Sequence, residues 1–214
     1  MTTAISTQPK LIEQQTLRLQ QLKDDANDIA QALADQLWDK FEIEIEEATE
    51  DGFLFDTASM TQTSLSLSLA MSFQDAFERD VLSIFASLHA QLASAYGAEA
   101  TDSTGIDLAG LRKGLKLRRH AEALIHDAIQ SAKPGVSRVL GVIVGDLFRD
   151  PMQQIDAIEQ DMQKDAQAVR RALLKLGDPI RSLVAQETCQ LINQGRLSLS
   201  QGLDRLASVQ TPAA

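Results

Sequence analysis

Residues 19–41 read LQQLKDDANDIAQALADQLWDKF, and the apolar side chains in this stretch recur at the spacing of a helix. From Leu33 the interval between them is four and four, through Leu37 to Phe41, which would locally unwind a supercoil. Before that point the intervals are three and four, a heptad pattern formed by Leu19, Leu22, Ala26, Ile29 and Leu33. The stretch therefore predicts a long amphipathic helix that packs in a bundle or in a coiled coil.

Helical patterns also occupy most of the chain on either side of this stretch. The first helix is expected over residues 8–40, because Pro9 suits a first turn. Pro151 and Pro179 each follow an aspartate, which is typical of helix starts. Further helices are expected over 74–96, 106–132, 136–148, 151–176, 180–194 and about 200–209. We predict a mainly α fold, an elongated helical bundle or a coiled-coil-like hairpin.

One part of the chain has a different period. The stretch FEIEIE at 41–46 alternates apolar and acidic residues, and LSLSLAMSF at 65–73 alternates again. Between them, Asp51-Gly52 is a favoured hairpin turn. The alternation predicts a small antiparallel β element near 41–73. A helical interpretation of 64–73 stays open, because three apolar residues are also four apart: Leu65, Leu69 and Phe73.

Charge divides the chain near residue 105. Residues 1–105 carry 5 basic and 18 acidic side chains, whereas residues 106–214 carry 15 basic and 12 acidic ones. The formal net charge of the whole chain is −10. We therefore expect an acidic half over 1–105, with a long helix, a small β meander and a helix. A helical half over 106–214 would include a basic amphipathic helix.

The predicted helix over 106–132 has a basic face. At about 100° per residue, five side chains fall within an arc of about 120°, and these are Arg112, Lys113, Lys116, Arg119 and His120. Basic amphipathic helices bind acidic proteins, anionic membrane surfaces or phosphates. The other interpretation is a solvated face, or one that lies against the acidic half of the same fold. We name the five residues as a candidate site for an anionic surface.

A nearly all-apolar segment follows at 136–148, after Pro134-Gly135. Beside a basic helix, such a segment can dip into a membrane surface. The other interpretation is a central core helix of the bundle. The candidates for an apolar contact are Val136, Val139, Leu140, Ile143, Leu147 and Phe148.

The acidic excess is concentrated over residues 35–51, which hold eight carboxylates and one lysine. Because like charges repel one another, this segment needs solvent or a basic neighbour. We expect it to lie close to the basic 112–120 face, within the monomer or across a dimer. No calcium-loop pattern occurs there, so the carboxylates do not predict a metal site.

Motifs for catalysis are absent from the sequence. It contains no glycine-rich phosphate or dinucleotide loop and no nucleophile elbow, and its three histidines are scattered. Cys189 has no base near it in the sequence and is expected to be a small buried residue. We predict no catalytic residue, no metal and no cofactor. The net negative charge also disfavours binding to nucleic acid.

These observations favour a non-enzymatic helical interaction protein, such as an adaptor, a scaffold or an assembly subunit, that acts through amphipathic helices. Its partner would be another protein or a second copy of the chain. The alternative is a peripheral membrane protein that docks through the basic helix 106–132 and the apolar segment 136–148. No secretory signal is visible, and no apolar run approaches the roughly 20 residues that span a bilayer. We therefore expect a cytoplasmic location.

Overall fold

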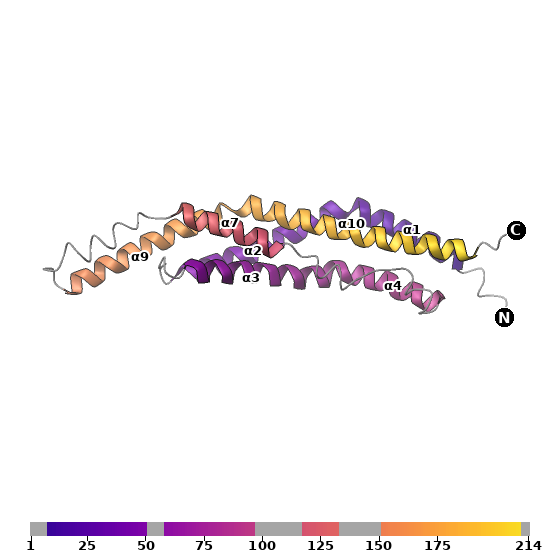
Figure 1. Ribbon diagram of the computed structural model, residues 1–214, viewed down its shortest axis with the longest axis horizontal. Helices are drawn as coiled ribbons and strands as arrows, with labels where there is room; N and C mark the ends of the chain where they lie inside the picture. The colour runs from indigo at the N-terminus through magenta and orange to yellow at the C-terminus, as the bar shows by residue number, and fades with distance from the viewer. Residues whose placement is uncertain (1–7, 51–57, 97–116, 133–150, 211–214) are drawn as a thin grey trace. The chain divides into compact units, whose positions relative to one another are not determined.

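A computed structural model describes residues 8–50, 58–96, 117–132 and 151–210 (Figure 1). Within these residues every regular element is helical and no strand occurs, so the prediction of a mainly α fold is confirmed. In chain order the elements are α1 (Gln8–Asp24), α2 (Ala26–Glu50), α3 (Ala58–Phe77), a π-helical turn (Glu78–Leu82), α4 (Ser83–Tyr96), α7 (Leu117–Ser131), α9 (Pro151–Leu174) and α10 (Gly177–Gln210).

The contacts within the chain define two compact units. Unit 1 comprises Met1–Leu33, Phe73–Lys116 and Val184–Ala214. Unit 2 comprises Ala34–Ser72 and Leu117–Leu183. Each unit draws on both sides of residue 105, so the division by contacts and the division by charge follow different boundaries.

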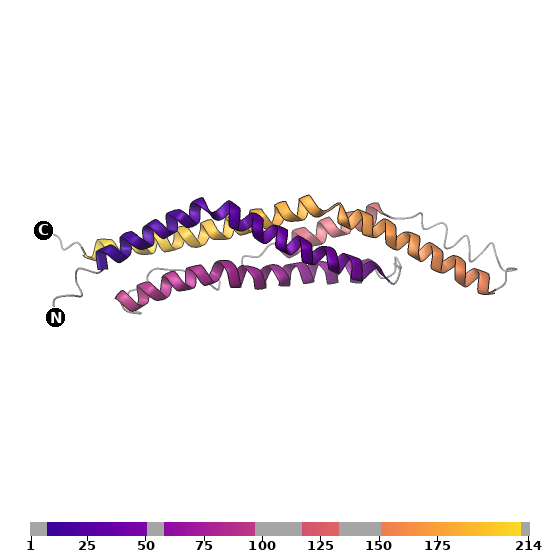
Figure 2. The same ribbon diagram turned by 180° about the vertical axis from the view of Figure 1, so that it is seen from behind.

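Leucines from three helices form the core of unit 1. Figure 2 shows α1 and the C-terminal part of α10 side by side and running in opposite directions. Leu22 and Ala26 of the predicted heptad pattern are buried in this unit, so the apolar face predicted for the first helix is a packed face. The core cluster itself joins α1, α4 and α10 through Leu19, Leu88, Leu92, Leu199, Leu203 and Leu206.

The helix boundaries differ from those that we expected. The helix predicted over 8–40 is divided at Asp25 into α1 and α2, although the backbone N–H of Ile29 still donates to Asp25 O at 3.0 Å across the junction. The helix α2 then extends past residue 40 to Glu50. In the same way α10 continues through Gly195, where we expected a break. Gly195 is buried, and packing offsets the roughly 1 kcal/mol that a glycine costs inside a helix.

A π-helical turn joins α3 to α4 without interrupting the helix. The backbone N–H of Ser83 donates to both Glu78 O and Val81 O. Val81 and Leu82 within the turn are buried. A single π turn inserts one residue into a helix and so rotates the residues that follow it. The predicted helix over 74–96 is therefore present, with this turn in it.

Unit 2 includes α7 packed against α9, the later part of α2, the first part of α3 and the start of α10. Trp38 lies in its core, with only 4% of the residue exposed and its ring centroid 6.0 Å from that of Phe41. The guanidinium of Arg181 lies over the Trp38 ring, 5.5 Å from the centroid. Gly177 leaves room for the same ring, because a Cβ there would lie 3.3 Å from two ring carbons.

The prediction of a β element near 41–73 is wrong. Residues 41–50 belong to α2 and residues 58–73 to α3, whereas 51–57 lie outside the described residues. Phe41 and Ile45 are buried, but Ile43 between them is 57% exposed. Likewise Leu69 is buried while Leu67 is 41% exposed. The spacing of four sets the buried face, and the apolar residues between these positions lie on the outer side of each helix.

Hydroxyl side chains that favoured a strand are accommodated by hydrogen bonds within the helices. Thr49 Oγ1 donates to Ile45 O at 2.8 Å, and Ser66 Oγ donates to Thr63 O at 3.1 Å. These bonds satisfy hydroxyl groups of two buried residues. The local preference for a strand is weak, and burial of the apolar residues that are spaced four apart overrides it.

Candidate interaction surfaces

The basic face predicted on the helix over 106–132 lies only partly within the described residues. In α7, Leu117, Ala121 and Ile125 are buried, whereas Arg119 and His120 are exposed. Arg112, Lys113 and Lys116 lie outside the described residues. The amphipathic character predicted for this helix is present over Leu117–Ser131. Its role as a site for an anionic partner stays a prediction.

The apolar candidates of the segment 136–148 also lie outside the described residues, and this includes Val136, Val139, Leu140, Ile143, Leu147 and Phe148. The choice between a core helix and a membrane contact for this segment therefore stays open. No helix in the part of the chain that the structure describes is both long enough and apolar enough to cross a bilayer.

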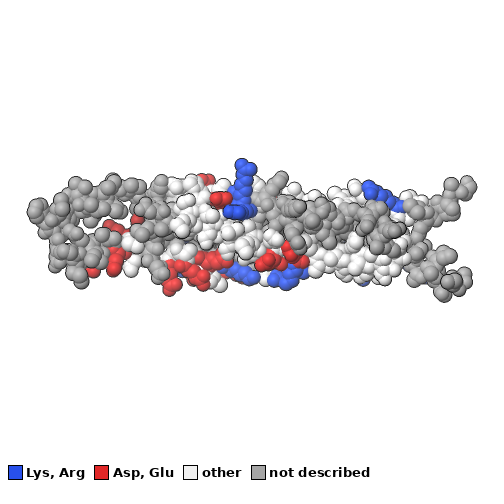
Figure 3. All heavy atoms as spheres, turned by 60° about the horizontal axis from the view of Figure 1, so that its bottom comes forward, with Lys and Arg blue, Asp and Glu red and all other residues white. Residues whose placement is uncertain are grey.

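The acidic segment lies on α2 and has basic neighbours from two other helices of unit 2. Glu46 forms an ion pair with Arg170 of α9. Asp35 Oδ1 lies 3.4 Å from Nε of Arg181 in α10. Both pairs are at the surface, where an ion pair stabilises the fold by about 0–1 kcal/mol. On the face shown in Figure 3, acidic and basic side chains lie next to one another.

These basic neighbours come from the basic half of the chain, as the charge pattern suggests, but from α9 and α10. Arg170 and Arg181 could not be identified from the sequence as partners of the acidic segment. Each comes directly after a residue of an apolar stripe, and its position does not distinguish it from other basic residues. Glu44 on the same segment accepts a hydrogen bond from Ser68 Oγ of α3 at 2.7 Å. Carboxylates of the segment therefore contact α3, α9 and α10 of unit 2.

Another surface of unit 2 is apolar and free of charge. Met60 is 74% exposed, Leu67 is 41% exposed and Met71 is 57% exposed. Residues that are four and seven apart lie on the same side of a helix, so these three side chains form one row, which we call the α3 stripe. Leu65 and Leu69 are buried on the opposite side of α3.

The surroundings of the α3 stripe are unusual for this chain. Charged residues make up 23% of the sequence, yet none occurs from Ala58 to Gln74. The exposed neighbours of the stripe are the small hydroxyl residues Thr63 and Ser64. Its sequence signal is the alternation over 65–73, which we took as a strand. A helical wheel drawn on Leu65 and Leu69 would have placed Leu67 and Met71 outside.

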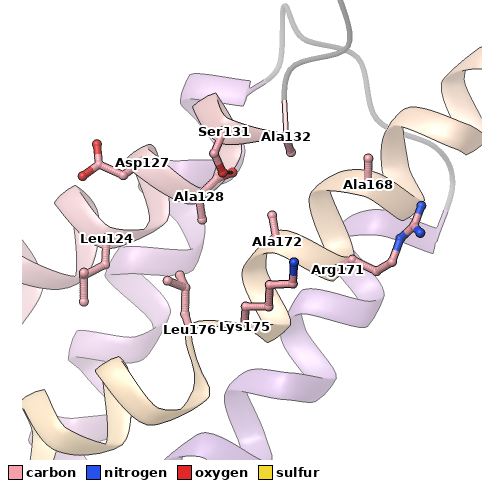
Figure 4. Close-up of a pocket in the computed structure, with 10 residues that line it drawn as sticks. All are labelled: Leu124, Asp127, Ala128, Ser131, Ala132, Ala168, Arg171, Ala172, Lys175 and Leu176. Atoms are coloured by element: carbon pink, nitrogen blue, oxygen red, sulfur yellow. Dashed lines mark hydrogen bonds between the residues drawn. The ribbon is translucent and has the colours of Figure 1, made fainter.

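A groove of about 550 Å³ runs between α7 and α9 of unit 2 (Figure 4). Asp127 lines one side, and Arg171 and Lys175 line the other. The hydroxyl of Ser131 donates to Ala128 O at 2.7 Å, so it is held within its own helix. The remaining lining is apolar and mostly small: Leu124, Ala128, Ala132, Ala168, Ala172 and Leu176.

A second groove, of about 490 Å³, lies in unit 1 between α4 and the helices α1 and α2. Arg18 lines it, and its guanidinium donates to Gln91 Oε1 at 2.9 Å. The same oxygen accepts a hydrogen bond at 2.7 Å from the amide of Gln15, which is fully buried. This partly buried contact favours one register of α1 against α4, because a shift would leave the buried Gln15 amide unpaired.

Cys189 is partly buried, whereas the sequence predicted a buried residue. Burial raises the pKa of Cys189, so the reactive thiolate form is disfavoured at neutral pH. The thiol donates weakly to Asn27 Oδ1 at 3.3 Å. Among the residues that the structure describes, no group of three or more His, Cys, Asp or Glu residues is placed to hold a metal ion.

Comparison with known proteins assigns no relative to this chain. No protein family, no curated protein and no solved structure matches it. The functional argument therefore rests on the surfaces of the molecule itself.

Proposed function

We propose that this protein is a non-enzymatic helical interaction protein, an adaptor, scaffold or assembly subunit, whose α3 stripe binds another protein chain. The observation that supports this most directly is the exposure of Met60, Leu67 and Met71 on a helix with no charge from Ala58 to Gln74. Contiguous exposed apolar side chains on a soluble surface mark interaction sites, whereas isolated ones do not.

The energetic reason is the transfer of apolar surface out of water. Covering a partly exposed leucine or methionine stabilises a complex by about 1 kcal/mol, at roughly 25 cal/mol per Å². Methionine also adapts its shape to an irregular partner surface. Amphipathic helices that bind a groove present anchors at i, i+3, i+4 and i+7. Met60, Leu67 and Met71 lie on one such face, with the small residues Thr63 and Ser64 at the intervening positions.

The grooves support the non-enzymatic part of this proposal. Neither groove of the described residues is lined by a histidine or a cysteine. The Ser131 hydroxyl donates to a backbone carbonyl, and the structure records no hydrogen bond between it and Asp127 or Lys175 of the same lining. A nucleophile is activated by a base that is hydrogen-bonded to it, and the Ser131 hydroxyl is bonded to a backbone carbonyl instead.

The proposal retains several predictions made from the sequence. It includes a coiled-coil-like, elongated arrangement of the helices, a homo-oligomer and a cytoplasmic location. The burial of Leu19, Leu22 and Leu33 supports packing along the heptad face. A protein that works by apolar contact between helices needs no cofactor.

The proposal is tested by capture from an extract of the host cells. We would compare the tagged wild-type chain with a stripe variant that carries Met60→Ser, Leu67→Ser and Met71→Ser. A control variant would carry Leu17→Ser, Ile43→Ser and Leu197→Ser, which are 60%, 57% and 52% exposed and thus remove similar apolar surface elsewhere. Captured chains, including untagged copies of this one, would be quantified by mass spectrometry.

We expect the stripe variant to lose a captured chain by at least about tenfold, which corresponds to about 1.4 kcal/mol. The control variant should retain it. Circular dichroism would show that all three proteins have the same helix content. If both variants capture the same chains as the wild type, the α3 stripe is not an interaction surface and the proposal is wrong.

A further inference from the structure

We infer that the α3 stripe binds the α3 stripe of a second copy of this chain, antiparallel and related by a two-fold axis at Leu67. This inference rests on the proposed function, and it names the partner. It is carried by three properties of α3: its lack of charge, the order of large and small side chains along its outer face, and its size.

The first property concerns repulsion between copies. The chain has a net charge of −10, so most contacts between two copies bring like charges together. On α2, for example, Asp39, Glu42 and Glu47 are all exposed. On α3, no charged residue occurs between Ala58 and Gln74. A second copy that approaches α3 therefore meets apolar side chains on a helix segment without charge of its own, although Glu44 of α2 accepts a hydrogen bond from Ser68 of the same helix.

The antiparallel direction of the two α3 helices follows from the next charged residue along the helix. Asp75 comes four residues after Met71 in α3 and is exposed. A parallel arrangement would place Asp75 beside Asp75 of the second copy. An antiparallel arrangement centred on Leu67 places it opposite Ser59, so the two aspartates are about 24 Å apart along the axis at 1.5 Å per residue. That separation is more than twice the screening length of about 8–10 Å.

The register of one α3 helix against the other follows from the side chains on the outer face of α3. With Leu67 opposite Leu67, Met71 of each copy lies opposite Thr63 of the other. At this pair a large side chain meets a small one, which is the arrangement that interdigitates well, whereas Met60 lies opposite Gln74. Thr63 Oγ1 already donates to Ser59 O at 2.9 Å, so its hydroxyl keeps a partner when the pair forms. Ser64, which is also small and exposed, lies opposite Ala70.

The size of the contact predicts its strength. The 20 residues of α3 span about 30 Å. A strip about 10 Å wide along this length covers roughly 600 Å² over both copies, below the 1,200–2,000 Å² of stable complexes. The dimer should therefore be reversible and should form only as the protein concentration rises.

Sedimentation velocity on the purified protein, at concentrations up to about 0.5 mM, tests the association, because a contact of this size is in the weak class. We expect the wild type to shift from monomer to dimer over this range. Leu67→Lys should raise the dissociation constant at least tenfold, because each lysine faces its own copy across the axis. Leu197→Lys, which adds the same charge at a residue 52% exposed in unit 1, should behave as the wild type.

Mixing variants tests the two-fold axis. Leu67→Lys and Leu67→Glu should each be monomeric alone and should associate when mixed, because only a contact of residue 67 with itself pairs the two charges. In a Cys189→Ser background, Leu67→Cys should form an intermolecular disulfide on mild oxidation. Met60→Cys should not, because the antiparallel register separates the two Met60 positions by about 21 Å.

A wild-type protein that stays monomeric over the whole range overturns the inference, as does a dimer that Leu67→Lys leaves unchanged. Ready cross-linking of Met60→Cys overturns the antiparallel direction. These results are separable from failure of the proposed function. A monomeric purified protein whose capture of another chain still depends on the stripe removes the second copy as partner and leaves the interaction role in place.

Discussion

Gly177 and Trp38 meet in unit 2 at a contact with little spare room. A Cβ on Gly177 would lie 3.3 Å from ring carbons Cε2 and Cζ2 of Trp38. The ring cannot move freely, because Phe41 packs against it and the Arg181 guanidinium lies over it. The requirement for glycine at the start of α10 is therefore one of space, imposed by a side chain that precedes it by more than a hundred residues.

We predict that Gly177→Ala lowers the free energy of unfolding by about 1 kcal/mol. Overpacking costs about 1–3 kcal/mol, which exceeds the gain of up to about 1 kcal/mol from the better helix propensity of alanine. Denaturant unfolding would measure the change. In a Trp38→Phe background the smaller ring leaves room, so the same substitution should cost less. Equal costs in the two backgrounds would show that the Trp38 contact is not the cause.

At the scale of the helix, Ile43 and Ile45 separate the two interpretations of residues 41–46. Ile45 is fully buried in α2, while Ile43 is 57% exposed. We predict that Ile45→Ala lowers the free energy of unfolding by about 2–5 kcal/mol, and that Ile43→Ala changes it by less than about 0.5 kcal/mol. In a strand both side chains would lie on one face, and both substitutions would cost stability. Urea unfolding of the two variants measures this difference.

The same residues show how far the fold could be predicted. Apolar spacing located the helices, because burial of a stripe is what stabilises a helix in a protein. It did not exclude a strand over residues 41–46, because Phe41-x-Ile43-x-Ile45 satisfies the period of two and Phe41-x-x-x-Ile45 satisfies the period of four. The decision depends on which neighbours are available to cover each face. That is a property of the packed unit, and a single segment does not contain it.

For the molecule as a whole, the split of charge along the chain predicted a contact between the acidic segment over 35–51 and the basic 112–120 face, and that contact stays a prediction. The ion pairs that the structure describes for this segment join Glu46 to Arg170 and Asp35 to Arg181, which belong to other helices. The residues that form them could not be named, because surface pairs are weak and follow from packing decided elsewhere. The α3 stripe was missed for a different reason: the alternation over 65–73 favoured a strand, and the outer face of the alternative helix was not considered.

The excess of negative charge leads to a prediction about salt. If two copies meet through the uncharged α3 stripe, the net charge of −10 on each opposes their approach, while the contact itself contains no ion pair. Raising the ionic strength from about 0.01 M to about 0.15 M shortens the screening length from about 30 Å to about 8 Å and weakens this repulsion. We therefore expect the dimer to become tighter as salt is added, as measured by sedimentation at each ionic strength. Contacts between acidic and basic surfaces respond in the opposite way, because salt screens their attraction. An association that weakens over this range would show that the copies meet through charged side chains, and Leu67→Lys would then leave it unchanged.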